Sequence, residues 1–269
     1  MIQLGDIGDV VLTTPCIRAL RENFPESRIV VAVKEKAAEL LEDCPWLDHL
    51  AVVAKSSRTF WEELRYQLGF FRDLRCHRCE LAVDLRTGTR GAMLGLLSGA
   101  KQRIGFYAED GKLWRNRVFA PLLHREYSPD EHVVDYLLCL LESFGISPVG
   151  RTPELSVSKT RSEEITRLLR EQGVENGCFL VAVQPFSLWG YKEWASENIS
   201  SLIRWLIDEK MAIAIVTGAE HEHDRAQGIV DSCGVVGCYN LAGKTSIAMY
   251  AALLKKCDLF FGVDSLGSI

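Results

Sequence analysis

Four loops of this chain combine glycine with charged or hydroxyl residues, and each follows a run of apolar residues. The first is "QLGDIGDVVLTTP", in which Gly5 and Gly8 alternate with Asp6 and Asp9. A glycine-rich turn entering a helix is usually a phosphate cradle. Here two acids would repel a diphosphate, and the G-x-G-x-x-G spacing is absent. Two interpretations remain open: a helix-capping aspartate, or a carboxylate kept ionised by the helix N-terminus as a general base.

The other three loops lie in the second half of the chain. "QPFSLWGYKEW" contains Ser187 and Lys192, a lysine that either neutralises a diphosphate or is an ordinary solvated side chain. "TGAEHEHDRAQ" contains Glu222, which could accept hydrogen bonds from ribose hydroxyls. "GVDSLGSI" places Asp264 and Ser265 before an expected helix whose amides could bind phosphate oxygens.

Metal binding is not expected from the local motifs. Cys76 and Cys79 in "CHRC" have the spacing of a metal or redox pair, but no second pair of ligands follows at matching spacing. His221 and His223 would point about 200° apart on a helix. The nine cysteines are an odd number, and we expect them to be small buried side chains. The sequence therefore predicts no metal ion and no cofactor.

A local excess of positive charge marks part of the first half. Residues 55–103 contain ten lysines and arginines against five acids, although the whole chain carries a net charge of −5. This excess indicates either an anionic partner or the solvated face of a long helix. The basic residues are Lys55, Arg58, Arg65, Arg72, Arg75, Arg78, Arg86, Arg90, Lys101 and Arg103.

Alternating strands and helices must position these loops. Apolar runs of strand length alternate with helical segments in both halves, which is typical of parallel sheets covered on both faces. The sequence predicts an α/β fold of two Rossmann-like domains, 1–150 and 151–269, joined by a linker with an edge strand at 146–158. Strands are expected at 2–4, 28–33, 49–53, 80–85, 179–185, 211–218 and 259–263.

Composition excludes several classes of protein. The chain has 269 residues, 48% of them hydrophobic and 25% charged, which is ordinary for a globular protein. Its pI of about 5.8 argues against a general nucleic-acid binder. No apolar run reaches the roughly 18 residues of a membrane span, and the start lacks the features of a signal peptide. We expect a cytoplasmic protein.

Taken together, five segments resemble glycosyltransferase family 9, the ADP-heptose:lipopolysaccharide heptosyltransferases of the GT-B fold. They are "GDIGDVVLTTPCIRALRENFP", "DLRTGTRGAMLGLLSGAKQRIGF", "SLWGYKEW", "TGAEHEHDRA" and "LAGKTSIAMYAALLKKCDLFFGVDS". The resemblance covers essentially the whole chain. It implies two Rossmann-like domains whose sheets face across a cleft, the first binding the acceptor and the second the nucleotide sugar.

The resemblance also implies a reaction and roles for its residues. The reaction is an inverting, metal-independent transfer of a heptose from ADP-heptose to the inner core of lipopolysaccharide. Asp9 matches the base of the family. Lys192 and Ser187 match groups that contact the donor phosphates, and Glu222 matches the acid that holds the ribose. Asp264 and Ser265 match the turn that receives the diphosphate.

The family pattern departs at the end of the chain. After Asp264 and Ser265 the family has a glycine and then a histidine that opens a helix, whereas this chain reads Leu266-Gly267-Ser268-Ile269. We therefore expect a second domain without its last helices. Two alternatives stay open: another nucleotide sugar and glycan acceptor, or a non-catalytic remnant that binds nucleotide sugar. The implied partners are the donor, an anionic lipopolysaccharide acceptor and a peripheral contact with the inner membrane.

Overall fold

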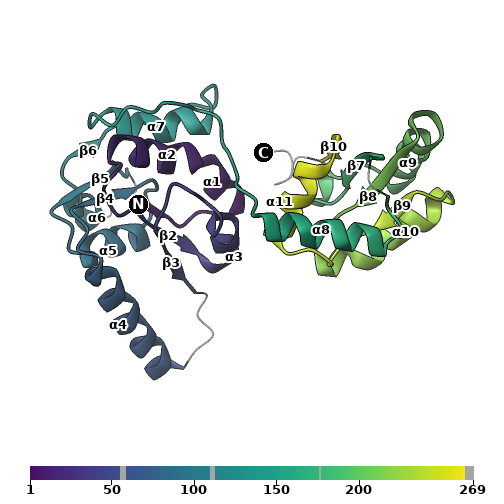
Figure 1. Ribbon diagram of the computed structural model, residues 1–269. Coiled ribbons are helices and arrows are strands. Elements are labelled where there is room, and N and C mark those ends of the chain that lie inside the picture. Colours follow the sequence, from purple (N-terminus) through teal and green to yellow (C-terminus); the bar gives the residue numbers. More distant parts are fainter. Residues whose placement is uncertain (55–58, 110–112, 176, 264–269) are drawn as a thin grey trace. The chain divides into compact units, whose positions relative to one another are not determined.

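The computed structural model describes residues 1–54, 59–109, 113–175 and 177–263. The chain divides into two compact units, Met1–Ser156 and Val157–Ile269. Each is an α/β unit built on a parallel sheet with helices on both faces (Figure 1). The first unit ends at residue 156, six residues after the domain boundary expected from the sequence at residue 150.

The first unit contains a sheet with the strand order β3-β2-β1-β4-β5-β6, and all neighbouring strands are parallel. In chain order its described elements are β1 (Ile2–Gln3), α1 (Ile7–Leu12), α2 (Thr14–Asn23), β2 (Val30–Lys34), α3 (Glu35–Ala38), η1 (Glu39–Leu41), β3 (His49–Val53), α4 (Phe60–Cys76), β4 (Leu81–Asp84), α5 (Thr89–Leu97), β5 (Gln102–Phe106), α6 (Leu113–Val118), β6 (Leu122–Leu123) and α7 (Val133–Glu142).

Both faces of this sheet are buried, and this explains its continuous apolar strands. Val31 and Val33 of β2 pack with α2 and α7. Their neighbours Val30 and Ala32 point to the opposite face and pack with α4 and α5. A strand that contributes to two cores needs apolar residues at every position, not only at alternate ones.

The second unit contains a parallel sheet with the order β10-β7-β8-β9. Residues of α9 and α10 cover one face and residues of α8 and α11 the other. Its described elements are α8 (Lys159–Glu171), β7 (Phe179–Gln184), η2 (Gly190–Lys192), α9 (Ser196–Lys210), β8 (Ala212–Val216), η3 (Glu220–Glu222), α10 (His223–Cys233), β9 (Cys238–Asn240), α11 (Ile247–Lys256) and β10 (Leu259–Gly262).

The prediction of an edge strand within 146–158 was wrong, because no strand forms in that described stretch. Its backbone bonds to side chains of α2 instead of to a sheet. The Glu154 N–H donates to Thr14 Oγ1 at 3.0 Å, and Asn23 Nδ2 donates to the Ser147 carbonyl at 2.8 Å. The connection therefore lies along the surface of the first unit before the second begins.

Candidate active site

Each sheet has one topological switch point, where the connections from two neighbouring strands leave in opposite directions. In open sheets of this kind, ligands bind at the switch point, outside the carboxyl ends of the strands. In the first unit this point lies between β1 and β4, and in the second between β7 and β10. The "GDIGD" loop follows β1 and the "SLWGYKEW" loop follows β7. Two of the predicted loops therefore lie at switch points.

Asp9 caps α1 and also presents a carboxylate at the switch point of the first unit. The Asp6 N–H donates to Asp9 Oδ2 at 2.8 Å, and Arg86 Nη1 donates to the same oxygen at 2.6 Å. The Asp9 side chain keeps 35% of its surface exposed. The Asp9 side chain therefore caps the helix and is also accessible to solvent.

Asp6 has a different environment. Its side chain is 73% exposed and lies 2.7 Å from Lys36 Nζ and 3.4 Å from Lys34 Nζ. The hydrogen bond and charge of Lys36 lower the pKa of Asp6. The Asp6 side chain is therefore neutralised at the surface by residues of β2 and α3, whereas its backbone N–H is the group that contacts Asp9.

Gly5 and Gln3 shape the loop that carries Asp9. A Cβ at Gly5 would lie 2.3 Å from Asp9 Oδ2 and 2.7 Å from Arg86 Nη1, so only glycine leaves room for the pair. The buried Gln3 side chain accepts a hydrogen bond from the Gly5 N–H at 3.0 Å and donates to Thr13 Oγ1 at 2.8 Å. The end of β1 thus fixes both the loop and the end of α1.

Arg86 is held in turn by two buried charges at the end of β4. The Arg86 N–H donates to Asp84 Oδ1 at 3.2 Å, and Arg115 Nη2 donates to the Arg86 carbonyl at 2.8 Å. Arg115 Nη2 also lies 3.6 Å from Asp84 Oδ2, and both side chains are almost completely buried. Arg115 additionally donates to the Phe106 carbonyl, which ties β4 to β5.

Asp84 has the most strongly perturbed carboxyl group of this network. Burial raises the pKa of Asp84 to about 7, against the opposing effects of the Arg86 N–H and the Arg115 guanidinium. Gly91 makes the burial possible, because a Cβ there would lie 2.5 Å from Asp84 Oδ2. The carboxyl group is sealed beneath α5, so it supports the site and does not face a substrate.

In the second unit, the loop after β7 carries Ser187 and the half-buried Lys192. Lys192 ends the short helix η2, where its N–H donates to the Trp189 carbonyl at 2.9 Å. Ser187 accepts from the Trp189 N–H at 3.3 Å through its hydroxyl, and its own N–H donates to Glu193 Oε1 at 3.1 Å. The loop is thus a closed turn that holds both predicted residues.

Glu193 connects this loop to α10. Its Oε2 lies 2.5 Å from Arg225 Nη2, and the hydrogen bond from Arg225 lowers the pKa of Glu193. The Arg225 guanidinium also lies over the Phe186 ring, 4.6 Å from its centroid. The loops that follow β7 and β8 are therefore fixed to each other.

Glu222 follows β8 and folds back onto its own loop. The Ala219 N–H donates to Glu222 Oε2 at 2.6 Å, and 13% of the Glu222 side chain is exposed. A Cβ at Gly218 would lie 2.9 Å from this carboxylate oxygen. The arrangement repeats that of Gly5 and Asp9 in the first unit.

Asp264 and Ser265 lie outside the described residues, as do Lys55 and Arg58 of the basic segment. Within the described ranges, the structure places Ser187, Lys192 and Glu222 in loops at the carboxyl edge of one sheet. It places Asp9 at the carboxyl edge of the other.

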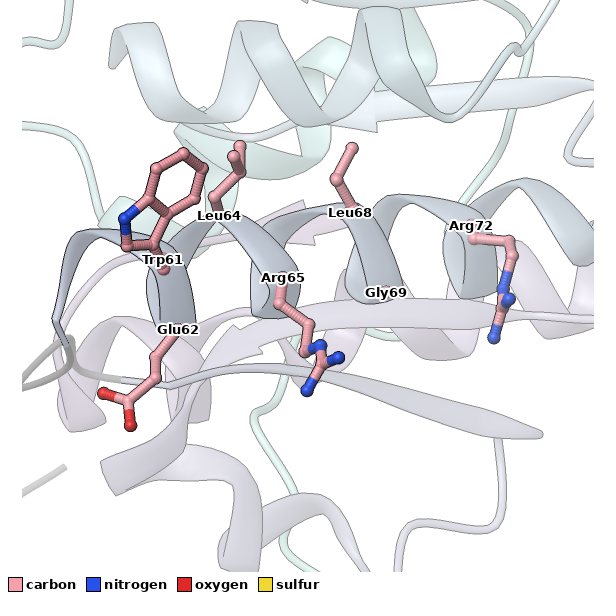
Figure 2. A pocket seen from close by; sticks show the side chains of 7 residues that line it. All are labelled: Trp61, Glu62, Leu64, Arg65, Leu68, Gly69 and Arg72. Atoms are coloured by element: carbon pink, nitrogen blue, oxygen red, sulfur yellow. The ribbon is translucent and has the colours of Figure 1, made fainter.

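Part of the basic segment forms an amphipathic surface on α4. Trp61, Leu64 and Leu68 line a pocket on this helix together with Arg65 and Arg72. Figure 2 shows the apolar side chains pointing to one side of α4 and the arginines to the other. Trp61 is 75% exposed and Leu68 63%. Of the described helices, none has the length and apolar character needed to cross a membrane.

Four supporting residues were not identified from the sequence: Gln3, Asp84, Arg115 and Glu193. Two of them had a detectable signal, because Gln3 and Asp84 are polar residues inside buried apolar strands. A buried polar group requires partners, so such positions mark local networks. Arg115 and Glu193 had no comparable signal in the sequence.

Comparison with known proteins gives consistent matches. The family model for glycosyltransferase family 9 (heptosyltransferase) matches residues 67–266. Lipopolysaccharide heptosyltransferase 3 of Escherichia coli (strain K12) is 24% identical over 262 residues, which are 96% of this chain and 74% of that protein.

Solved structures with this fold include a glycosyl transferase family 9 protein from Veillonella parvula DSM 2008. It has a TM-score of 0.86 at 20% identity, covering 98% of this chain and 74% of that one. The E. coli heptosyltransferase WaaC, solved with ADP, has a TM-score of 0.72 at 17% identity, covering 98% and 80% of the two chains. The two parallel α/β sheets therefore have the GT-B type of fold.

Proposed function

Since the chain belongs to glycosyltransferase family 9, the heptosyltransferase family, we propose that it transfers a heptose from ADP-heptose to the inner core of lipopolysaccharide. The observation that carries the proposal is the family match over residues 67–266, which includes the loops of Lys192 and Glu222. A relative named as a lipopolysaccharide heptosyltransferase and a similar structure solved with ADP support the acceptor and the donor.

Asp9 is the proposed general base. Its two contacts, with Asp6 and Arg86, both go to Oδ2. Within the described residues no hydrogen bond involves Oδ1, so this oxygen is the one available to an acceptor hydroxyl. A general base positioned in this way typically increases the reaction rate by about 10²–10⁴-fold.

The second unit is the proposed donor site. Lys192, on the closed loop after β7, places a positive charge at the switch point, where the diphosphate would lie. Ser187 offers a hydroxyl on the same loop, and Glu222 offers a carboxylate to the ribose. By the resemblance, the turn at Asp264 and Ser265 contributes backbone N–H groups. These groups would stabilise the charge that grows on ADP as it leaves.

The proposed transfer is a single displacement that needs no metal ion. The acceptor oxygen forms a bond to the anomeric carbon while its proton moves to Asp9 Oδ1. The bond between that carbon and the ADP oxygen breaks, and its electron pair stays on the diphosphate. Because attack and departure occur on opposite faces, the configuration of the sugar inverts.

A panel of nucleotide sugars tests this function. The protein is incubated with an inner core that lacks heptose and with ADP-heptose, UDP-glucose or UDP-N-acetylglucosamine, and the product is identified by mass spectrometry. We expect transfer from ADP-heptose alone. Transfer from a UDP-sugar would favour an enzyme that uses another nucleotide sugar and glycan acceptor. No transfer, together with no calorimetric signal for ADP, would favour a non-catalytic remnant.

We also propose that the surface of α4 contacts an anionic membrane. An interfacial helix buries its apolar side chains among lipid chains and places arginines among the head groups. Trp61, Leu64 and Leu68 supply the apolar row, and Arg65 and Arg72 supply the charge. An acceptor that carries lipid would be met at such a surface, which supports a peripheral location at the inner membrane.

Co-sedimentation with vesicles tests the α4 surface. Phosphatidylglycerol vesicles are expected to bind the protein, and phosphatidylcholine vesicles to bind it weakly, since each arginine near an anionic surface adds about 1 kcal/mol. The variant Trp61→Glu/Leu68→Glu should lose this binding, whereas Val236→Glu, which changes a residue 91% exposed in the second unit, should keep it. Equal binding by both variants, or a concentration-dependent dimer that Trp61→Glu/Leu68→Glu abolishes, would contradict the membrane contact.

A further inference from the structure

Three potential metal ligands meet where the carboxyl-terminal part of α4 lies against the start of β3. His49 is the first residue of β3, Asp73 lies in the last turn of α4, and His77 is the C-cap residue of α4, four positions after Asp73. Asp73 Oδ2 lies 3.7 Å from His49 Nε2 and 3.9 Å from His77 Nε2. The two imidazole rings lie 4.4 Å apart between centroids. One ligand atom from each residue falls within 4.8 Å of the others.

His77 is the side chain that needs an explanation. Only 6% of its surface is exposed. Both ring nitrogens are buried and have no hydrogen-bond partner among the described residues. Buried polar side chains are normally paired, so an imidazole with two unsatisfied nitrogens beside two other ligand groups indicates a missing partner.

The ring nitrogens of His77 can serve as metal ligands. A neutral imidazole keeps a lone pair on one nitrogen, which is the form that binds metal ions. Because both nitrogens are buried without a hydrogen-bond partner among the described residues, that lone pair is not used by the protein part that the structure describes.

We propose that His49, Asp73 and His77 form a binding site for a divalent transition-metal ion of the zinc class. Two imidazoles and one carboxylate are ligands that zinc accepts, with water in the fourth position. In a tetrahedral site with bonds of about 2.0–2.1 Å, ligand atoms are about 3.3 Å apart. Asp73 and His49 are 60% and 34% exposed, so their side chains can make the small adjustment that this requires.

The site lies away from the proposed chemistry. His49 is at the amino end of β3, whereas Asp9 follows the carboxyl end of β1, and these are opposite edges of a parallel sheet. A bound metal ion would connect α4 to the sheet. That helix has Leu74 as its one buried residue among those described, and its amino-terminal half extends away from the sheet (Figure 1). The ion would thus fix the base of the helix that carries the proposed membrane surface.

Calorimetric titration of the EDTA-treated protein with Zn²⁺, and optical titration with Co²⁺, test the site. We expect one equivalent to bind, with a Co²⁺ spectrum of nitrogen and oxygen ligands. The variants His77→Gln and His49→Gln should weaken Zn²⁺ binding by at least about 10-fold, as should Asp73→Asn, whose exposed position makes it the variant most certain to fold. His221→Gln, which changes a histidine 83% exposed in the second unit, should bind Zn²⁺ as the wild type does.

Two results would overturn the site. One is an absence of stoichiometric Zn²⁺ binding, or binding that Asp73→Asn and His77→Gln leave unchanged. The other is a thiolate-to-cobalt charge-transfer band that disappears in Cys76→Ser/Cys79→Ser, since it would place the metal on the "CHRC" cysteines.

Discussion

Asp9 and Glu222 each cap a helix through one carboxylate oxygen, and each is proposed to contact a ligand as well. Each accepts the N–H of the residue that precedes its helix, and each fills the space above a glycine. Capping uses one carboxylate oxygen, which leaves the other for chemistry. Both acids were predicted as site residues from their position in a loop after a strand. The sequence could not show which oxygen is occupied, because that depends on Arg86, which lies 77 positions from Asp9 in the chain.

Asp84 predicts a pH dependence of stability at the residue scale. Its folded pKa of about 7 lies above the ordinary value of 3.8, so the protonated form favours the folded state. The stability from this group is present below about pH 4 and is lost as the pH rises to about 7, by at most about 1.4 kcal/mol per pH unit. Asp84→Asn mimics the protonated group and should lack this slope.

The measurement is the free energy of unfolding of the wild type and Asp84→Asn across that pH range. The difference between them should shift in favour of Asp84→Asn as the pH rises. A constant difference at every pH would mean that Asp84 has the same pKa in the folded and unfolded states.

At the scale of elements, strands with a clear apolar run were predictable, and β5 and β6 were not. The strand β3 has the predicted bounds, because the four apolar residues that follow His49 favour a strand. The strand β5 starts with Gln102 and Arg103, and β6 has only two residues, so neither has a strong local pattern. The helical segment that follows β1 is broken at Thr13, since Pro15 is tolerated only in the first turn of α2.

Gly5→Ala tests how the loop between β1 and α1 holds Asp9. The new Cβ would lie 2.3 Å from Asp9 Oδ2 and 2.6 Å from Asp9 Cβ. We expect a loss of about 1–3 kcal/mol in the free energy of unfolding, as for other forced contacts, and a lower transfer rate. Gly228→Ala serves as the control: its Cβ meets open space in the middle of α10, so it should stabilise the helix by up to about 1 kcal/mol. Wild-type stability in Gly5→Ala would show that Asp9 is not confined as described.

At the scale of the whole molecule, the alternation of strands and helices was enough to predict two α/β units with their loops at the carboxyl ends of the strands. The sites that join distant segments were beyond such reasoning. His49 and His77 belong to one cluster only because the end of α4 lies beside the start of β3, and their 28-residue separation matches no metal-binding motif. In the sequence, the two cysteines of "CHRC" suggested a metal site. In the structure, it is the histidine between them, His77, whose ring nitrogens are buried without a hydrogen-bond partner among the described residues.

The most direct test distinguishes the proposed base in the first unit from the proposed donor site in the second. In Asp9→Asn, the rate of heptose transfer should fall by about 10²–10⁴-fold, while the Kd for ADP measured by calorimetry stays that of the wild type. Asp6→Asn, which changes an exposed acid paired with Lys36, should keep the wild-type rate. Full transfer by Asp9→Asn, or a loss of ADP affinity that equals the loss of rate, would contradict the assignment of Asp9 as the base.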